Sequence, residues 1–256
     1  MKVWARVRKV NGMEFYHSPN ISQSVHGFRE MGVEIVNYES VDEIYDWITH
    51  DDIVLDGITQ CRYVFKKFGK EPHLEDYPKV LEPFLGRKIW NDTMDHINLH
   101  PELWNIFVKP ISEKAFTGRV IKTPADLVGC GNSHENYEVL CSEIIDIKRE
   151  WRGFMYYDNL IDLRPYFGEW KYNYDPAVIE RAVEAYRKWE ERPVACSLDF
   201  AVIIDAEGKE KTIFLEANDA YALGTYGLMP IAYAKLISAR WSQILDRPDE
   251  FNFAMN

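Results

Sequence analysis

Three oxygen-bearing side chains near the C-terminal end of the sequence are spaced like ligands of a hard divalent cation. Two apolar runs flank a short polar loop around Glu207–Gly208, which is the pattern of a β-hairpin. A turn there places Asp199 directly opposite Glu216, and Asn218 follows two residues later on the same face. Carboxylate and amide oxygens inside an apolar sheet suit Mg²⁺, which commonly also binds substrate phosphates.

The same residues allow a second interpretation. The two acids could lie at solvated strand ends, paired with Lys209, Lys211 or an arginine. A slip of one residue in the hairpin register would also place one strand's side chains on the other face.

A lysine near the middle of the chain is a candidate for binding phosphate. Lys109 ends the apolar strand expected over 104–110. The loop that follows contains Lys114, and its Thr117 and Gly118 let backbone N–H groups approach a phosphate. The alternative is a lysine that extends to solvent beside a surface hairpin. Walker and dinucleotide-binding glycine motifs are absent from the sequence.

A third group consists of one acid and two arginines. Glu150 and Arg152 alternate onto one face of a strand, and Arg164 lies across an expected turn at Asp158–Asn159. Arginines can clamp phosphate or carboxylate oxygens with two parallel hydrogen bonds. The alternative is a ladder of salt bridges between the two strands.

The elements that must position these residues begin with a small parallel α/β unit. In the first third of the chain, strands expected at 1–8, 33–36 and 52–55 alternate with helices at 23–31, 41–48 and 58–68. A polar segment with prolines, 69–78, reads as a linker. The remainder predicts strands at 87–90, 104–110, 116–121, 139–145, 150–157 and 160–166, the hairpin, and helices at 92–99, 175–190 and 230–245.

Composition bounds the class of protein. The chain has 256 residues, 46% of them hydrophobic, and a net charge of −11, which favours a globular protein and argues against non-specific nucleic-acid binding. No run is long enough to span a membrane, and the N-terminus lacks a signal-peptide core. The four cysteines form no Cys-x-x-Cys pair, so we expect reduced thiols and a cytoplasmic location.

The order of these motifs resembles the ATP-grasp superfamily. It runs Val–Lys–Pro, Ser–Glu–Ile–Ile, Glu-x-Arg, Arg164, Ser–Leu–Asp and Glu–Ala–Asn over residues 87–240. The chain is similar in particular to the ribosomal-protein glutamate-ligase (RimK-like) group and to a small, often phage-borne branch. The resemblance implies an α+β ATP-grasp fold, in which two α+β subdomains (86–145 and 146–256) sandwich ATP, after a small α/β pre-ATP-grasp domain (1–85).

The resemblance also implies a role for each motif residue. Lys109 would contact the ATP phosphates, and Lys114, Thr117 and Gly118 would belong to the loop over them. Glu143 and Ile145 would border the adenine, and Glu150 would bind the ribose. Arg152 and Arg164 would neutralise the γ-phosphate or a bound carboxylate, and one or two Mg²⁺ would be held by Asp199, Glu216 and Asn218. The phosphate loop has a single glycine where many members have several, and Lys88 is the candidate for the family's earlier lysine.

The implied activity is that of an ATP-dependent carboxylate–amine ligase that uses Mg²⁺ and an acyl phosphate. Its partners would be small-molecule, peptide or protein carboxylates and amines, without nucleic acid or membrane. The alternatives are an ATP-grasp phosphotransferase of the kinase type and a non-catalytic nucleotide-binding module. The loop 221–226 after the metal motif would line the acceptor pocket or cover the core.

Overall fold

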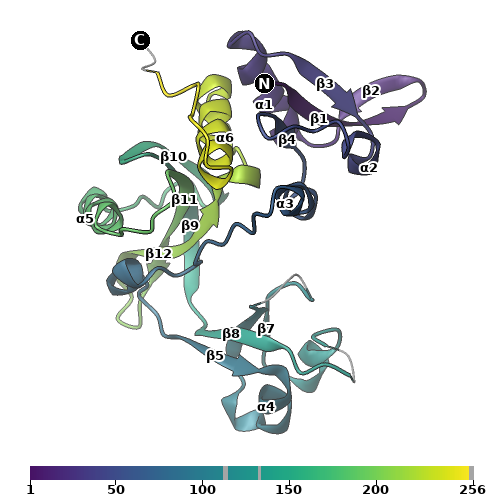
Figure 1. Cartoon of the computed structure of the whole chain (residues 1–256). Helices are drawn as coiled ribbons and strands as arrows, with labels where there is room; N and C mark the ends of the chain where they lie inside the picture. The colour runs from purple at the N-terminus through teal and green to yellow at the C-terminus, as the bar shows by residue number, and fades with distance from the viewer. Residues whose placement is uncertain (112–114, 132–133, 254–256) are drawn as a thin grey trace.

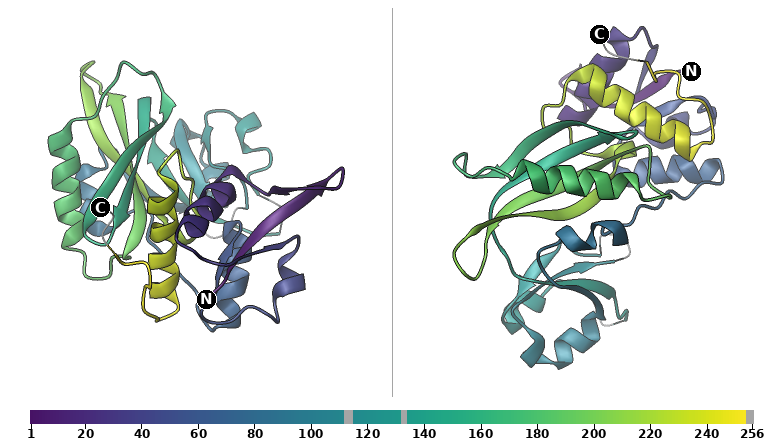
Figure 2. Two further views of the ribbon diagram at one scale, coloured as in Figure 1. Left: turned by 90° about the horizontal axis from the view of Figure 1, so that it is seen from above. Right: turned by 90° about the vertical axis from the view of Figure 1, so that its left-hand side faces the viewer.

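The computed structural model describes residues 1–111, 115–131 and 134–253. Their strands form three four-stranded sheets, here called the N-terminal, central and C-terminal sheets. The C-terminal sheet lies between the other two, and the long helix α6 lies between it and the N-terminal sheet (Figures 1 and 2). The fold is therefore α+β, as predicted.

The N-terminal sheet has β1 at its centre. This strand pairs in parallel with β3 and β4 and antiparallel with β2, which confirms the expected parallel unit. The β1–β2 hairpin was not predicted, although Asn11–Gly12, with φ values of 51° and 78°, is a strong hairpin-turn signal. The elements are β1 (Val3–Val10), β2 (Met13–Tyr16), α1 (Pro19–Glu30), β3 (Ile35–Tyr38), α2 (Val41–Ile44), β4 (Ile53–Leu55) and α3 (Ile58–Lys67).

The central sheet is entirely antiparallel, in the order β5-β8-β6-β7. It has a core of its own, in which Ile106 and Val108 of β6 pack with Ile97 of α4. Its elements, with the 3₁₀ turn that precedes it, are η1 (Lys79–Phe84), β5 (Ile89–Thr93), α4 (Met94–Leu99), η2 (Pro101–Leu103), β6 (Ile106–Pro110), β7 (Arg119–Ile121), η3 (Pro124–Leu127) and β8 (Glu138–Glu143).

The C-terminal sheet has the order β10-β9-β11-β12 and two different faces. Helix α5 packs on one face, where Tyr186 meets Leu198 and Phe200. Phe154 and Ala195 on the other face pack in the core that contains α6. The elements are β9 (Asp146–Tyr156), β10 (Asn159–Gly168), α5 (Pro176–Arg187), β11 (Ala195–Ile204), β12 (Glu210–Asp219), η4 (Ala220–Ala222) and α6 (Pro230–Ile244).

The β11–β12 hairpin reaches the predicted pairing by a different route. Its loop is centred on Glu207, because Asp205 N donates to Lys209 O and Gly208, at φ 79°, closes a three-residue turn. That loop pairs Phe200 with Phe214, one residue out of the predicted register. A β-bulge at Leu215 then restores the register and sets Asp199 opposite Glu216.

Hydrogen bonds from Arg87 stabilise this bulge. Its guanidinium donates to the carbonyl oxygens of Phe214 and Leu215 at 3.2 and 3.0 Å. These backbone acceptors lie on the outer edge of β12, where the sheet offers them no partner strand. The side chain therefore supplies the hydrogen bonds that the bulge needs.

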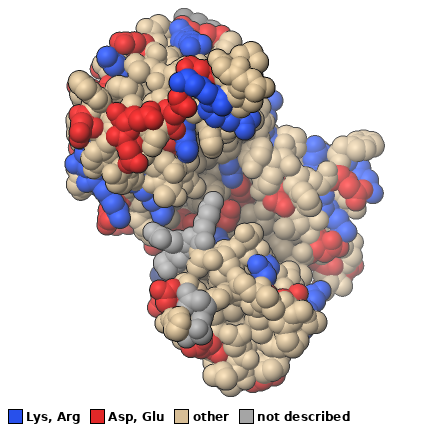
Figure 3. Space-filling view, turned by 90° about the vertical axis from the view of Figure 1, so that its right-hand side faces the viewer, with Lys and Arg blue, Asp and Glu red and all other residues tan. Residues whose placement is uncertain are grey.

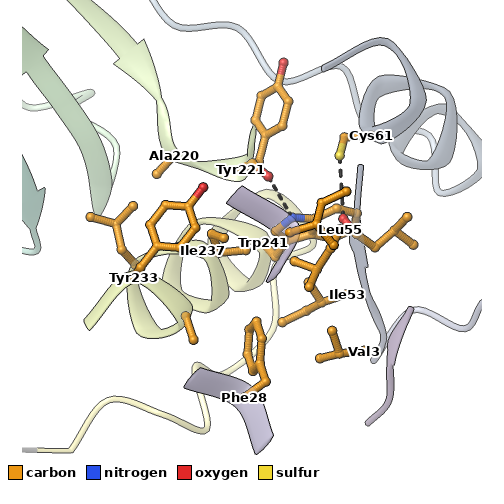
Figure 4. Close-up of a cluster of buried hydrophobic side chains, with 14 of the residues drawn as sticks. Val3, Phe28, Ile53, Leu55, Cys61, Ala220, Tyr221, Tyr233, Ile237 and Trp241 are labelled. Atoms are coloured by element: carbon orange, nitrogen blue, oxygen red, sulfur yellow. Dashed lines mark hydrogen bonds between the residues drawn. The ribbon is translucent and has the colours of Figure 1, made fainter. Parts of the chain in front are cut away.

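One hydrophobic core joins the N-terminal sheet to α6. Phe28, Ile53, Tyr233 and Trp241 are all buried in it (Figure 4). Gly27 of α1 brings the two helices together, since a Cβ at that position would lie 2.1 Å from the carbonyl oxygen of Pro230.

Two further expectations concern cysteines and membranes. All four cysteines are buried free thiols. Over the described ranges, every helix is too short or too polar to cross a bilayer.

Candidate active site

The three predicted metal ligands converge on the face of the C-terminal sheet that is opposite α5. Asn218 Nδ2 lies 3.3 Å from Asp199 Oδ2 and 3.5 Å from Glu216 Oε1. Rotation of the amide would present its oxygen to the same point. The geometry predicted from the hairpin is thus present, although the bulge was needed to make it.

Arg152 pairs with Asp199 in a buried, bidentate salt bridge. The two residues are direct partners on β9 and β11, with Nε–Oδ1 and Nη2–Oδ2 distances of 2.9 and 2.6 Å. Their side chains are only 9% and 2% exposed. Burial raises the pKa of Asp199, and the hydrogen bonds from Arg152 oppose that shift. Both groups depend on each other for charge neutrality.

Lys109 crosses from the central sheet to the same acids. Its Nζ lies 3.0 Å from Glu216 Oε2 and 2.7 Å from Asp76 Oδ2, and its side chain is 20% exposed. Burial alone would lower its pKa, but the negative charges of Glu216 and Asp76 outweigh burial and raise it. The lysine therefore faces the site, and the alternative of a surface lysine is wrong.

Glu150 lies on the same strand and face as Arg152. Burial raises the pKa of Glu150, Tyr166 opposes this by a hydrogen bond, and the charges of Asp199 and Glu216 add to it. Arg164 is the direct partner of Arg152 on β10, but its Nε donates to Asp162 at 2.8 Å. The structure therefore brings Glu150 to the site and leaves the Arg164 guanidinium turned to its own strand.

The predicted phosphate loop is described only in part. Lys114 lies outside the described residues. Gly118 passes close to β6, where a Cβ would lie 2.7 Å from Phe107 Cζ and 3.1 Å from Lys109 Cβ. The single glycine of this loop thus has a packing reason, and it lies beside Lys109.

The predicted adenine-side residues lie where the central sheet joins the C-terminal sheet. Glu143 ends β8, and its Oε2 accepts a hydrogen bond from Lys88 N at 2.9 Å. Ile145 follows and packs against the cluster that contains Ile203 and Leu215. It is the backbone N–H of Lys88 that makes this contact, and the role of Lys88 as the family's earlier lysine stays a prediction.

The loop after the candidate metal ligands covers the core at one end, as one of the two alternatives expected, while its role at an acceptor pocket stays a prediction. Tyr221 is buried, and its hydroxyl accepts a hydrogen bond from Arg62 Nε at 3.0 Å. Tyr226, at φ 42°, stacks on Tyr166 with a centroid distance of 4.7 Å and lies 4.9 Å from the Arg152 guanidinium carbon. One end of the loop covers the core and the other covers the arginine.

Sequence reasoning missed several of these neighbours. Tyr166 and Tyr226 were hidden because an aromatic residue in a strand or loop is usually a core residue. Asp76 lies in the polar linker, where one acid among several carries no pattern. Arg87 had a usable signal only in hindsight, as a cation next to a strand edge.

The parts of the molecule built on the central and C-terminal sheets, here called the two lobes, meet around these charged groups, where Lys109 contacts Glu216. Figure 3 shows a hollow between them in which Lys, Arg, Asp and Glu atoms are visible. Among the described residues, no group of three or more His, Cys, Asp or Glu side chains forms a metal cluster. The candidate ligand set instead combines two carboxylates with one amide.

A match to a model of a known protein family identifies the family of this chain. The family model described as "ATP-grasp domain, R2K clade family 2" matches residues 84–236, which include Lys109, Arg152 and the three candidate ligands. The chain belongs to the R2K clade of ATP-grasp domains. Membership confirms the predicted superfamily, while the RimK-like subgroup stays a prediction.

Solved structures agree on the fold of this R2K protein. D-alanine–D-alanine ligase from Bacillus anthracis has a TM-score of 0.56 at 12% identity, over 96% of this chain and 99% of its own. The same ligase complexed with ATP gives 0.53 at 12% identity, over 96% and 98%. N5-carboxyaminoimidazole synthetase from Staphylococcus aureus gives 0.55 at 9% identity, over 98% and 78%. A search of curated proteins found no match.

Proposed function

We propose that this R2K ATP-grasp protein is an ATP- and Mg²⁺-dependent ligase that joins a carboxylate to an amine through an acyl phosphate. The observation that carries the proposal is the pairing of two acids with two cations that come from opposite lobes. Lys109 of the central sheet reaches Glu216, and Arg152 of the C-terminal sheet holds Asp199. Such a set can exchange its internal partners for a nucleotide phosphate and a metal ion.

The donor set fits Mg²⁺. Asp199, Glu216 and Asn218 supply oxygen atoms within a few ångströms of one another, and hard divalent cations prefer such ligands. When bound there, Mg²⁺ would offset phosphate charge. With the acids engaged by the metal, Lys109 and Arg152 would be released to bind phosphate or carboxylate oxygens.

The remaining site residues have roles in binding and orientation. Thr117, Gly118 and Lys114 would cover the phosphates, Glu143 and Ile145 would border the adenine, Glu150 would bind the ribose, and Arg164 would assist Arg152. No side-chain nucleophile is required. The protein contributes positioning and electrostatic stabilisation, because the substrate carboxylate itself attacks.

The proposed reaction has two steps, transfer of the γ-phosphoryl group to the carboxylate and formation of the amide. A carboxylate oxygen attacks the γ-phosphorus, the bond from that phosphorus to the β–γ bridging oxygen breaks, and ADP leaves with the electron pair. The amine nitrogen then attacks the acyl carbon. Phosphate departs with the oxygen that came from the acid, and the amine loses a proton to solvent.

The test follows that oxygen. The protein is incubated with Mg·ATP, amines and pools of amino acids or peptides labelled with ¹⁸O in their carboxylates. We expect ADP, an amide, and phosphate that carries one ¹⁸O. Glu216→Gln should abolish the product, whereas Glu210→Gln at the exposed start of β12 should not.

Other products would contradict the proposal. AMP with pyrophosphate would indicate adenylation. A stable phosphorylated product that forms without an amine would indicate a kinase-type phosphotransferase.

A further inference from the structure

The linker before η1 places an acid on the phosphate lysine. Asp76 Oδ2 lies 2.7 Å from Lys109 Nζ, closer than Glu216 Oε2 at 3.0 Å. The Asp76 backbone is anchored separately, because its carbonyl oxygen accepts a hydrogen bond from Ala217 N at 2.8 Å. Asp76 precedes the family-matched segment, which begins at residue 84.

This contact uses a position that a phosphate oxygen would otherwise take. A lysine ammonium has three hydrogen-bond donors, and two of them point to carboxylates here. Glu216 would be released if it bound a metal ion, but Asp76 is not among the candidate metal ligands. Asp76 would then remain as the competitor for Lys109.

The local charge favours the same conclusion. Two carboxylates share the Lys109 ammonium, and the negative charge of Asp76 would oppose an anionic phosphate that approaches the same ammonium. The Asp76 side chain is 51% exposed, so water screens its charge and it can swing away at modest cost.

We propose that Asp76 is an internal substitute for a nucleotide phosphate, which holds Lys109 at Glu216 and weakens nucleotide binding until it is displaced. This inference rests on the proposed function. It assigns Asp76 a positioning role that acts through Lys109, and it makes the interdomain linker part of the nucleotide site.

The test is a double-mutant cycle on the affinity for Mg·ADP, measured by calorimetry. Asp76→Asn keeps the side-chain shape, an acceptor for Lys109 and the backbone anchor, but removes the charge. We expect the Kd to fall about fivefold, which corresponds to about 1 kcal/mol. Glu75→Gln, at the exposed neighbouring position, should change the Kd by less than about twofold.

The cycle separates a contact from a general charge effect. In a Lys109→Met background, Asp76→Asn should leave the Kd unchanged, because the group through which it acts is gone. Equal tightening in both backgrounds would show a long-range charge effect and overturn the inference. So would an unchanged or higher Kd for Asp76→Asn alone.

The outcomes also distinguish this inference from the proposed function. If the wild-type protein binds Mg·ADP and Asp76→Asn does not tighten binding, only the role of Asp76 is wrong. If neither protein binds Mg·ADP, the nucleotide site and the role of Asp76 are both wrong.

Discussion

The two candidate metal-binding acids should differ sharply in what they contribute to stability without ligand. Asp199 and Arg152 form a pair with side chains 2% and 9% exposed. Glu216 is 37% exposed, and its partner Lys109 keeps Asp76 if Glu216 is removed. Asp199→Ala therefore leaves the buried guanidinium of Arg152 without its carboxylate partner, whereas Glu216→Ala leaves Lys109 paired with Asp76.

The expected magnitudes follow from that contrast. Removing one partner of a buried ion pair costs about 3–5 kcal/mol. For a chain of this size, each kcal/mol lowers Tm by about 2–4 °C, so Asp199→Ala should melt about 6–20 °C below wild type. Glu216→Ala should change the free energy of unfolding by no more than about 1 kcal/mol.

Thermal melts and urea titrations of the ligand-free proteins at neutral pH measure the difference. The double variant Arg152→Met/Asp199→Leu is the matched control, since it removes the charges together and should recover most of the lost stability. Both single variants should lose ATP turnover. Equal melting temperatures for Asp199→Ala and Glu216→Ala would refute the reasoning, as would a double variant no more stable than Asp199→Ala.

Three further predictions concern other parts of the molecule. Lys109→Met should weaken Mg·ADP binding at least about tenfold by calorimetry while Tm without ligand stays within about 3 °C, because the apolar stem is kept; unchanged affinity would make the lysine structural. Burial raises the pKa of Glu150, so the stability that its protonation supplies is complete below about pH 4.3 and is lost as the pH rises through the higher folded pKa. In urea titrations, Glu150→Gln should therefore gain stability relative to wild type from pH 4 to 7. A stability difference that stays constant over this pH range would contradict the prediction. Gly27→Ala should lower Tm although alanine favours helices, because its Cβ would meet the Pro230 carbonyl. Ser22→Ala, on the exposed side of α1, should not lower Tm. A Tm for Gly27→Ala at or above that of wild type would mean that α1 can shift away from α6.

The β11–β12 hairpin shows which features of the candidate site could be predicted from the sequence and which could not. The expected pairing of Asp199 with Glu216 is correct, but the loop was misplaced by one residue and the bulge at Leu215 corrected the error. A bulge depends on contacts made outside the hairpin, here those of Arg87, which is distant in sequence. Local pattern gives the strands and their faces, while such a compensation depends on the folded environment.

Lys109 and Arg164 show the same limit in opposite ways. Lys109, at the end of an apolar strand, was predicted to bind phosphate, and in the structure its ammonium instead pairs with the carboxylates of Glu216 and Asp76. Arg164 was predicted to join Arg152, and the register brings them together, but Asp162 takes the guanidinium. Strand pairing determines where the Cα atom of a residue lies, whereas the available hydrogen-bond partners determine where the charged end of a long side chain lies.

The contact of α1 with α6 determines which parts of this chain can exist on their own. The segment recognised as the ATP-grasp domain ends at residue 236, within α6, and the buried face of that helix packs on residues that precede position 84. Excising the segment would cut the helix and expose Tyr233 and Leu236 to water. We therefore expect the segment matched by the family model to be unstable alone, so the N-terminal third and the remainder of the chain should be expressed and redesigned together.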